Sequence, residues 1–203
     1  MKLVYNVGVS DIIFYLLNKH KERQLFRPNN LYELTKQVYE KIKEDDFKFD
    51  EKSFSVDLSY YDLKFDEEIF YYLEFPLIKY FLEFDEFVLI GTEQKEKNLN
   101  SSKDTFYLAK ILELVLKKLG KDVKIIKLQD NPVDLEKMVD FYEKILENEN
   151  PDFFNITTGT PIQSIAMSLI AYKNNKKIVY KPWSENSNLI KWNLKKIIGE
   201  KVE

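Results

Sequence analysis

The sequence predicts an α/β fold in which a mostly parallel sheet carries helices on both faces. Two observations predict this class. Short apolar runs alternate with amphipathic segments of about 10–16 residues, which is the pattern of strand–helix–strand units. The apolar runs are nearly continuous, as expected for strands covered on both sides. A chain of 203 residues has room for one such domain. We expect it over residues 1–184, followed by a C-terminal extension over residues 185–203, which is a candidate link to an effector.

The first quarter of the chain shows strand signals and then a helix signal. Apolar runs at residues 3–7 and 12–17 predict two strands, and residues 24–26 are expected to return as the hairpin partner of the second. A Pro-Asn-Asn segment follows, which is typical of a helix start. Apolar residues then recur every three or four positions, so residues 30–44 are expected to form an amphipathic helix.

The next part of the chain has a weaker pattern. Phe54, Val56 and Leu58 alternate with polar residues, so residues 53–58 are expected to form an exposed strand. Residues 66–84 are rich in aromatic and aliphatic residues at mixed spacing. We expect a helix there that is kinked or interrupted near Pro76, with its aromatic side chains in the core or in a dimer interface.

The second half of the chain has the clearest pattern. Four apolar runs predict strands at residues 87–90, 123–128, 152–156 and 177–180. Between them, periodic apolar residues predict helices at residues 105–119, 132–147 and 162–172. Gly120 lies just past the first of these helices and Pro161 in the first turn of the last, as is common at helix ends. Residues 188–198 form an amphipathic tail.

Composition argues against several classes of function. The 31 Lys and Arg residues nearly balance the 34 Asp and Glu residues, whereas a duplex-DNA binder shows a basic excess. There is no cysteine and one histidine, His20, which argues against a zinc site, and we expect neither metal nor cofactor. No apolar run approaches the length of a membrane-spanning helix, and the N-terminus does not resemble a signal peptide. We therefore expect a cytoplasmic protein without a membrane partner.

Small polar residues follow several of the predicted strands. The segments are Gly8-Val9-Ser10-Asp11, Gly91-Thr92-Glu93-Gln94, Thr157-Thr158-Gly159-Thr160 and Lys181-Pro182-Trp183-Ser184. In open α/β sheets ligands bind beyond the carboxyl ends of the strands, where helix N-termini present free N–H groups to anions. The Thr-Gly segment is equally typical of a helix cap. The pattern predicts a site for phosphates or other anions, with a plain cap as the alternative for that segment.

Two charged residues at these strand ends have two interpretations each. Glu93 is either catalytic or paired with a lysine, and we favour the pairing. Lys181 is either a group that acts on a ligand or a strand-end lysine in solvent, and we favour the latter.

Three segments together resemble the CRISPR-associated Rossmann-fold (CARF) sensor domains. They are Val7-Gly8-Val9-Ser10-Asp11, Leu89-Ile90-Gly91-Thr92-Glu93-Gln94 and Asn155-Ile156-Thr157-Thr158-Gly159-Thr160-Pro161. The last resembles the family's Thr-Gly-Gly-Thr-Lys pattern and departs from it. Gly159 fills one glycine position, Thr158 stands where another residue is usual, and Pro161 replaces the lysine.

The resemblance implies a Rossmann-like, dimeric sensor of cyclic oligoadenylate, tetra- or hexaadenylate, the second messenger of type III CRISPR antiviral defence. The ligand would lie across a homodimer interface, and the signal would pass to an effector domain or partner. By position, the residues implied at the ligand are Gly8, Ser10, Asp11, Thr92, Glu93, Gln94, Thr158, Gly159, Thr160 and Gln163. The Arg-x4-His motif of the family's HEPN nucleases is missing from the sequence.

Three other functions stay open at this point. One is a metal-independent ring nuclease that cleaves the bound messenger, with Ser10, Thr160 and Lys181 as candidate catalytic residues. Another is a Rossmann-like enzyme of nucleotide or sugar metabolism, against which the sequence has neither a Gly-x-Gly-x-x-Gly nor a Walker motif. The third is a dimerisation or transcription-regulating module, for which the basic tail is too short to form a winged helix.

Overall fold

A computed structural model describes most of the chain. It describes residues 1–17, 23–26, 28–44, 46–61, 63–65, 68–94, 101–129, 134–182, 184 and 187–199. His20 and Trp183, which entered the sequence analysis, lie outside these ranges.

The elements alternate between strands and helices, with a strand-rich block between the first strand and the eighth. The strands are β1 Lys2–Asn6, β2 Ile13–Leu17, β3 Arg23–Phe26, β4 Phe49–Asp50, β5 Ser55–Asp57, β6 Lys64–Phe65, β7 Glu68–Glu74, β8 Glu86–Glu93, β9 Asp122–Gln129, β10 Phe153–Asn155, β11 Lys177–Tyr180 and β12 Ile190–Asn193. The α-helices are α1 Leu31–Ile42, α2 Phe106–Lys118, α3 Leu135–Glu149, α4 Pro161–Lys173 and α5 Leu194–Ile197. Short 3-10 helices span Val9–Asp11, Ile78–Phe81 and Ser101–Lys103.

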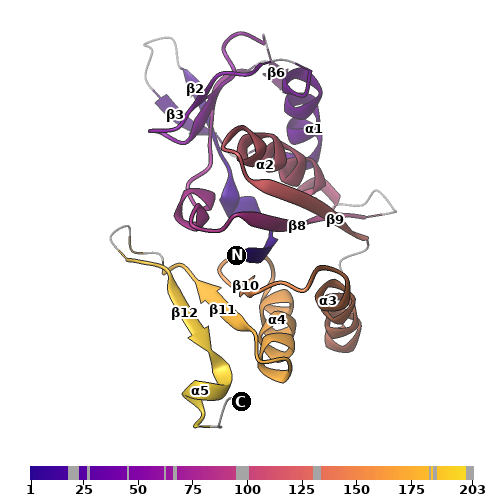
Figure 1. Cartoon of the computed structure of the whole chain (residues 1–203). Coiled ribbons are helices and arrows are strands. Elements are labelled where there is room, and N and C mark those ends of the chain that lie inside the picture. Colours follow the sequence, from indigo (N-terminus) through magenta and orange to yellow (C-terminus); the bar gives the residue numbers. More distant parts are fainter. Residues whose placement is uncertain are drawn as a thin grey trace.

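The main sheet has six strands in the order β12-β11-β10-β1-β8-β9. All neighbours are parallel except the edge pair β11 and β12. From β1 the chain proceeds through β8 and β9 on one side of β1, then crosses over through α3 to β10 on the other side (Figure 1). The switch point of the sheet therefore lies between β1 and β10, and it is there that open α/β sheets hold ligands, beyond the carboxyl ends of the strands.

Helices cover both faces of the main sheet, as the sequence predicts. Alternate residues of β1 point to opposite faces, so Leu3 and Tyr5 join one core cluster while Val4 joins the other. The first cluster includes the buried sides of α1 and α2, and the second those of α3 and α4. In Figure 1, α2 lies above β8 and β9, and α3 and α4 lie below.

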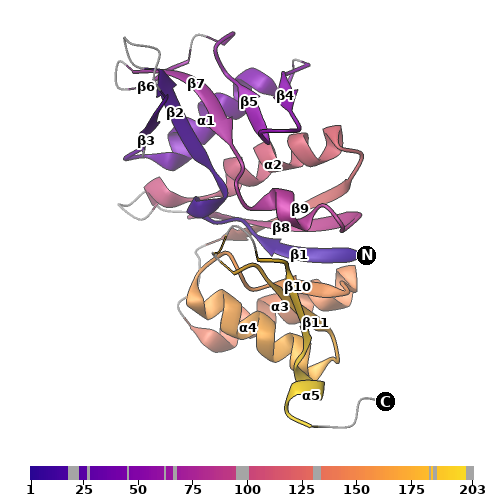
Figure 2. The same cartoon turned by 90° about the vertical axis from the view of Figure 1, so that its left-hand side faces the viewer.

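A second, smaller sheet forms between β1 and β8 in the sequence. Its order is β3-β2-β7-β5-β4, with β6 also paired to β7. Figure 2 shows this sheet stacked on the side of α2 that faces away from the main sheet. Its buried side chains belong to the same core cluster as α1, α2 and one face of β1, so both sheets share one core.

The prediction of a helix over residues 66–84 is wrong. The structure has strand β7 there, followed by the 3-10 helix Ile78–Phe81. β7 pairs with β2 on one side and β5 on the other, and four of its seven residues are β-branched or aromatic, a composition that favours strands. Pro76 lies just past the end of the strand rather than within a helix.

The strand expected over residues 53–58 exists as β5, but it is not exposed. Phe54, Val56 and Leu58 are all buried, because they pack in the shared core together with side chains of α1 and α2. The hairpin between β2 and β3 is confirmed, with Phe14 opposite Phe26.

The main sheet continues beyond residue 184. Strand β12 pairs antiparallel with β11, Ile178 opposite Trp192, and α5 follows it at once. Over the described residues, every helix is too short or too polar to cross a membrane.

Candidate functional site

Two loops meet at the switch point, one after β1 and one after β10. A Cβ atom on Gly8 would lie 3.3 Å from the backbone nitrogen of Gly159. Gly159 has a φ of +92°, and a Cβ there would lie 2.9 Å from the Cβ of Asn6 and 2.6 Å from Oε1 of Gln163. Only glycine suits such a close approach at a positive φ. The two glycines thus let the two loops lie against each other at the switch point, the place where open α/β sheets have their ligand crevice, and we call this place the crevice.

Asp11 holds the first loop in shape. Its carboxylate accepts a hydrogen bond from the hydroxyl of Tyr5 and another from the backbone N–H of Gly8, at 2.7 Å. Burial raises the pKa of Asp11 to about 7, against the opposing effect of these two hydrogen bonds. Asp11 is fully buried, whereas Val9 and Ser10 are exposed at the tip of the loop.

Thr158 and two asparagines tie the second loop to β1. The Thr158 hydroxyl donates to the carbonyl oxygen of Asn6 and accepts from Nδ2 of Asn155 at 2.9 Å. Asn6 also accepts from the Tyr142 hydroxyl at 2.6 Å, and Thr158 itself is buried. Asn6 was missed as a site residue. The signal was available, because Asn6 and Asn155 are polar residues that directly follow the apolar runs of β1 and β10.

The start of α4 is a capping box, so the cap interpretation of the Thr-Gly segment is confirmed. The N–H of Thr160 donates to Oε1 of Gln163 at 2.6 Å, and the N–H of Gln163 donates back to the Thr160 hydroxyl at 3.4 Å. The cap leaves other donors free. Among the described residues, the N–H groups of Ser10 and Ile162 find no acceptor. With the positive end of the α4 dipole, these donors make the crevice suitable for an anion.

The end of β8 lies at the same edge of the sheet, but its hydrogen bonds go to the start of α2 and the residue before it. The N–H of Val7 donates to the Ile90 carbonyl at 2.9 Å, so Thr92 is two residues beyond the pairing with β1. Thr92 exchanges hydrogen bonds with Thr105 at the start of α2, and the N–H of Gln94 donates to Asp104 at 2.8 Å. Among the described residues, the hydrogen bonds of Thr92 and Gln94 therefore run toward the start of α2 rather than toward the two glycine loops.

Glu93 pairs with a lysine, as the sequence analysis favoured. Its carboxylate accepts from Lys127 on β9 and from the hydroxyl of Tyr32 on α1, at 2.6 Å. Burial opposes ionisation of Glu93, but these two hydrogen bonds outweigh it and hold its pKa below the usual value. Glu93 therefore links β8 to β9 and to α1 through hydrogen bonds of its side chain.

Lys181 is buried, so the expectation of a lysine in solvent is wrong. Only 3% of it is exposed, and its Nζ donates to the carbonyl oxygens of Pro182 and Ser184 and to the hydroxyl of Ser187, at 2.8–3.0 Å. The ammonium also lies 4.2 Å from the ring centroid of Tyr80. Since an ammonium has three N–H donors, this one has none left for a ligand, and it holds the turn after β11 together.

The expected site residues thus divide into three groups. Ser10 and Gly159 are exposed at the surface of the crevice and Thr160 is half-buried there, while Gly8 forms the contact between the loops. Asp11, Thr158 and Gln163 are buried beneath that surface and hold its backbone. The third group is Thr92, Glu93 and Gln94, which bond to α1, α2 and β9.

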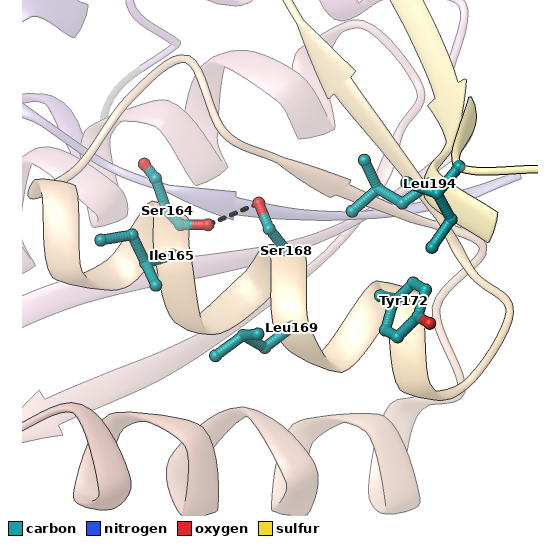
Figure 3. Close-up of a pocket in the computed structure, with 7 residues that line it drawn as sticks. Ser164, Ile165, Ser168, Leu169, Tyr172 and Leu194 are labelled. Carbon is teal, nitrogen blue, oxygen red and sulfur yellow. Dashed lines mark hydrogen bonds between the residues drawn. The ribbon is translucent and has the colours of Figure 1, made fainter.

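A groove of about 420 Å³ lies elsewhere, between α4 and α5 (Figure 3). It is lined by Ser164, Ile165, Ser168, Leu169, Tyr172, Leu194 and Ile198. It shares α4 with the crevice but none of the loop residues. In the part of the chain that the structure describes, no cluster of His, Cys, Asp and Glu side chains is suited to hold a metal ion.

Comparisons with protein-family models and with curated proteins found no match to this chain.

Proposed function

We propose that the crevice at the switch point binds a cyclic oligoadenylate, tetra- or hexaadenylate, and that the protein is a cytoplasmic sensor in type III CRISPR antiviral defence. The observation that carries the proposal is the contact between Gly8 and Gly159 beside the N-terminus of α4. It creates a surface of backbone donors and hydroxyls, which is the kind of surface that binds phosphate groups.

The charges of the crevice also support an anionic ligand. The one carboxylate in the first loop, Asp11, is buried and turned toward Tyr5, so it presents no exposed negative charge. The groups at this surface are the exposed Ser10 side chain and the half-buried Thr160 hydroxyl. The N–H groups of Ser10 and Ile162, which have no acceptor among the described residues, add two donors. In the proposal these contact phosphate and ribose, while Asp11, Thr158 and Gln163 keep the loops in place.

The remaining parts of the proposal concern the bases and the second copy. Thr92, Glu93 and Gln94 lie along the same edge and would border the adenine bases. A symmetric ring with several phosphates suits a site made by two copies of the crevice around a two-fold axis. The signal would then pass to an effector domain or partner.

Calorimetric titration with cyclic tetraadenylate and cyclic hexaadenylate tests the proposal. We expect a Kd in the micromolar range or below for at least one ring, and no binding of the linear tetraadenylate at the same concentrations. Chromatography of the ligand after incubation shows whether the ring stays closed, as expected for a sensor, or is cleaved, as in a ring nuclease. Absence of binding up to about 1 mM for both rings would contradict the proposal, since that corresponds to less than about 4 kcal/mol of binding free energy.

A pair of variants tests the location of the site. Ser10→Asp places a negative charge at the exposed tip of the first loop, and we expect at least tenfold weaker binding because the charge repels the phosphates. Ser59→Asp adds the same charge at an exposed turn of the small sheet. We expect its affinity to stay within twofold of the wild type. Equal effects of the two variants would remove the first loop from the site.

A further inference from the structure

Asp11 is a carboxyl group buried directly beneath the surface of the crevice. Its side chain is fully covered, and its two hydrogen-bond partners are neutral donors, the Tyr5 hydroxyl and the Gly8 N–H. Among the described residues, no lysine, arginine or histidine pairs with it. A buried carboxylate without a cationic partner loses the hydration that stabilises its charge, so burial favours its neutral form.

This carboxyl group lies close to the atoms that would meet a ligand. A Cβ atom on Gly8 would lie 3.3 Å from the backbone nitrogen of Gly159, 3.7 Å from the Ser10 hydroxyl and 3.8 Å from Oδ2 of Asp11. The amide, the hydroxyl and the carboxyl oxygen therefore surround one point at the contact between the two loops. The N–H of Gly159, like that of Ser10, has no acceptor among the described residues. An anion bound to these donors would be a close neighbour of the Asp11 carboxyl group.

Both protonation states of Asp11 fit the same loop geometry. In the neutral form the proton lies on the oxygen that faces Tyr5, whose hydroxyl can accept a hydrogen bond as well as donate one. The Tyr5 hydroxyl also interacts with Thr158, which can take the hydrogen that Tyr5 then turns away from Asp11. Oδ2 still accepts from the Gly8 N–H at 2.7 Å. A change of protonation therefore changes the charge under the crevice and leaves the loop in place.

We infer that binding of an anion in the crevice is coupled to the uptake of a proton by Asp11. An ionised Asp11 repels the phosphates across a short path of protein, where water screens the two charges weakly. The neutral form removes this repulsion. The affinity for a phosphate-bearing ligand therefore falls as pH rises and Asp11 ionises. The inference rests on the proposed function, because it concerns the same site and the same ligand.

The other ionisable groups around the crevice keep their charge near neutral pH. Burial raises the pKa of Asp11 to about 7. Burial also raises the pKa of Tyr5 and of Tyr142, so both phenols stay neutral. Glu93 is partly buried, but its hydrogen bonds hold its pKa below the usual value, so it stays ionised. The ammonium of Lys181 is bonded within the turn after β11. Among these groups, Asp11 is the one whose charge changes near pH 7.

Calorimetric titration with cyclic tetraadenylate or hexaadenylate in several buffers measures the coupling directly. The proton comes from the buffer, so the slope of the observed enthalpy against the ionisation enthalpy of the buffer counts the protons taken up. The ligand contributes none, because phosphodiesters and adenine titrate only at more acidic pH. If the neutral form binds about tenfold more tightly, the pKa of Asp11 rises by about one unit on binding. We then expect uptake of about half a proton per site at pH 7.5 in imidazole, HEPES and Tris.

The dependence of affinity on pH identifies the titrating group. For the wild type we expect roughly sevenfold weaker binding at pH 8.5 than at pH 6.0. Asp11→Asn has nearly the shape of the neutral acid, so its affinity should stay within about twofold at both pH values and it should take up no proton. Asp122→Asn is the matched control. Asp122 is exposed at the start of β9, at the opposite end of the parallel strands from the crevice, and its variant should keep the pH dependence of the wild type.

The outcomes that would overturn the coupling are separable from the test of the ligand. Ring binding without proton uptake at pH 7.5, or with the same affinity at pH 6.0 and 8.5, would overturn the coupling and leave the proposed function standing. Asp11→Asn with the pH dependence of the wild type would also overturn it, since another group would then titrate. The proton count of the wild type decides the question even if this variant does not fold.

If neither ring binds, sulfate is the probe for the same titrations, because it carries no group that titrates in this range. Proton uptake by the wild type with sulfate, and none by Asp11→Asn, would keep the coupling and remove the proposed function. Absence of sulfate binding, or binding without proton uptake, would remove both.

Discussion

Asp11 illustrates how a buried side chain determines the surface that a ligand would meet. It is one residue away from Ser10, yet its carboxylate points into the core toward Tyr5 while Ser10 is exposed. The hydrogen bond from the Gly8 N–H to this carboxylate closes the loop on itself. The backbone donors at the tip of the loop are therefore set in place by a group that the ligand would not touch.

The raised pKa of Asp11 predicts a specific dependence of stability on pH. Burial raises its pKa to about 7 in the folded protein, whereas in the unfolded chain it is near 4. Between these values the folded state binds one proton more than the unfolded state, so the free energy of unfolding falls as pH rises. The fall amounts to at most about 1.4 kcal/mol per pH unit.

Urea denaturation of the wild type and of Asp11→Asn at pH 5, 6, 7 and 8 measures this effect. The substitution removes the titrating group. The free energy of unfolding of the wild type minus that of Asp11→Asn should therefore fall as pH rises from 5 to 7 and then level off. The subtraction cancels the titration of the other carboxylates. A difference that is constant over the whole range would show that Asp11 does not titrate there.

At the same scale, the strand-end loops show the limit of reading single residues. Thr158 and Thr160 are two positions apart and chemically identical, but one is buried against Asn6 and the other caps α4. Lys181 is a surface lysine by its position in the sequence, but it is buried and its ammonium donates hydrogen bonds to three oxygen atoms. Which hydroxyl or ammonium turns inward depends on the partner it finds there, and those partners are up to 152 residues away in the chain.

At the scale of elements, the helices and most of the strands follow from periodicity, and β7 does not. Strands β8 to β11 and helices α1 to α4 all overlap the segments expected from their patterns. The aromatic residues around β7 have no clear period, so periodicity favours neither a helix nor a strand there. Backbone pairing with β2 on one side and β5 on the other stabilises this segment as a strand. Only the folded chain brings those partners together.

The central place of β7 predicts a large cost for truncating its core side chain. Leu73 is fully buried in the core that the two sheets share. We expect Leu73→Ala to lower the free energy of unfolding by about 2–5 kcal/mol, through lost burial and the cavity left behind. Leu25→Ala, on the exposed side of β3 in the same sheet, should cost less than about 0.5 kcal/mol. Urea denaturation compares them, and similar costs would mean that the small sheet does not share the core of the main sheet.

At the scale of the whole molecule, the order of the strands brings the candidate site together. Because β10 returns next to β1 after the chain has run out to β9, the loops that follow residues 6 and 155 become neighbours. The same arrangement places the N-terminus of α4 beside these two loops.

The proposed homodimer predicts that thermal stability depends on protein concentration. Association stabilises the folded state by mass action, so raising the wild type from 1 to 50 µM should raise its Tm by about 2–5 °C. Differential scanning calorimetry or fluorimetry at both concentrations measures it, and a wild-type Tm that is independent of concentration would contradict the homodimer.

Local pattern was sufficient to predict the α/β class and the glycine turns after β1 and β10, and it gave a cap as one of two interpretations of the start of α4, because each depends on residues close together in the chain. Gly91, expected just after a strand, lies within β8 instead. The roles within the crevice required the fold. Asn6, Thr158 and Tyr142 meet only when β10 lies beside β1 and α3 packs beneath them. Periodicity specifies which face of an element is apolar, but long-range packing decides which apolar faces are covered and which polar groups are left for a ligand.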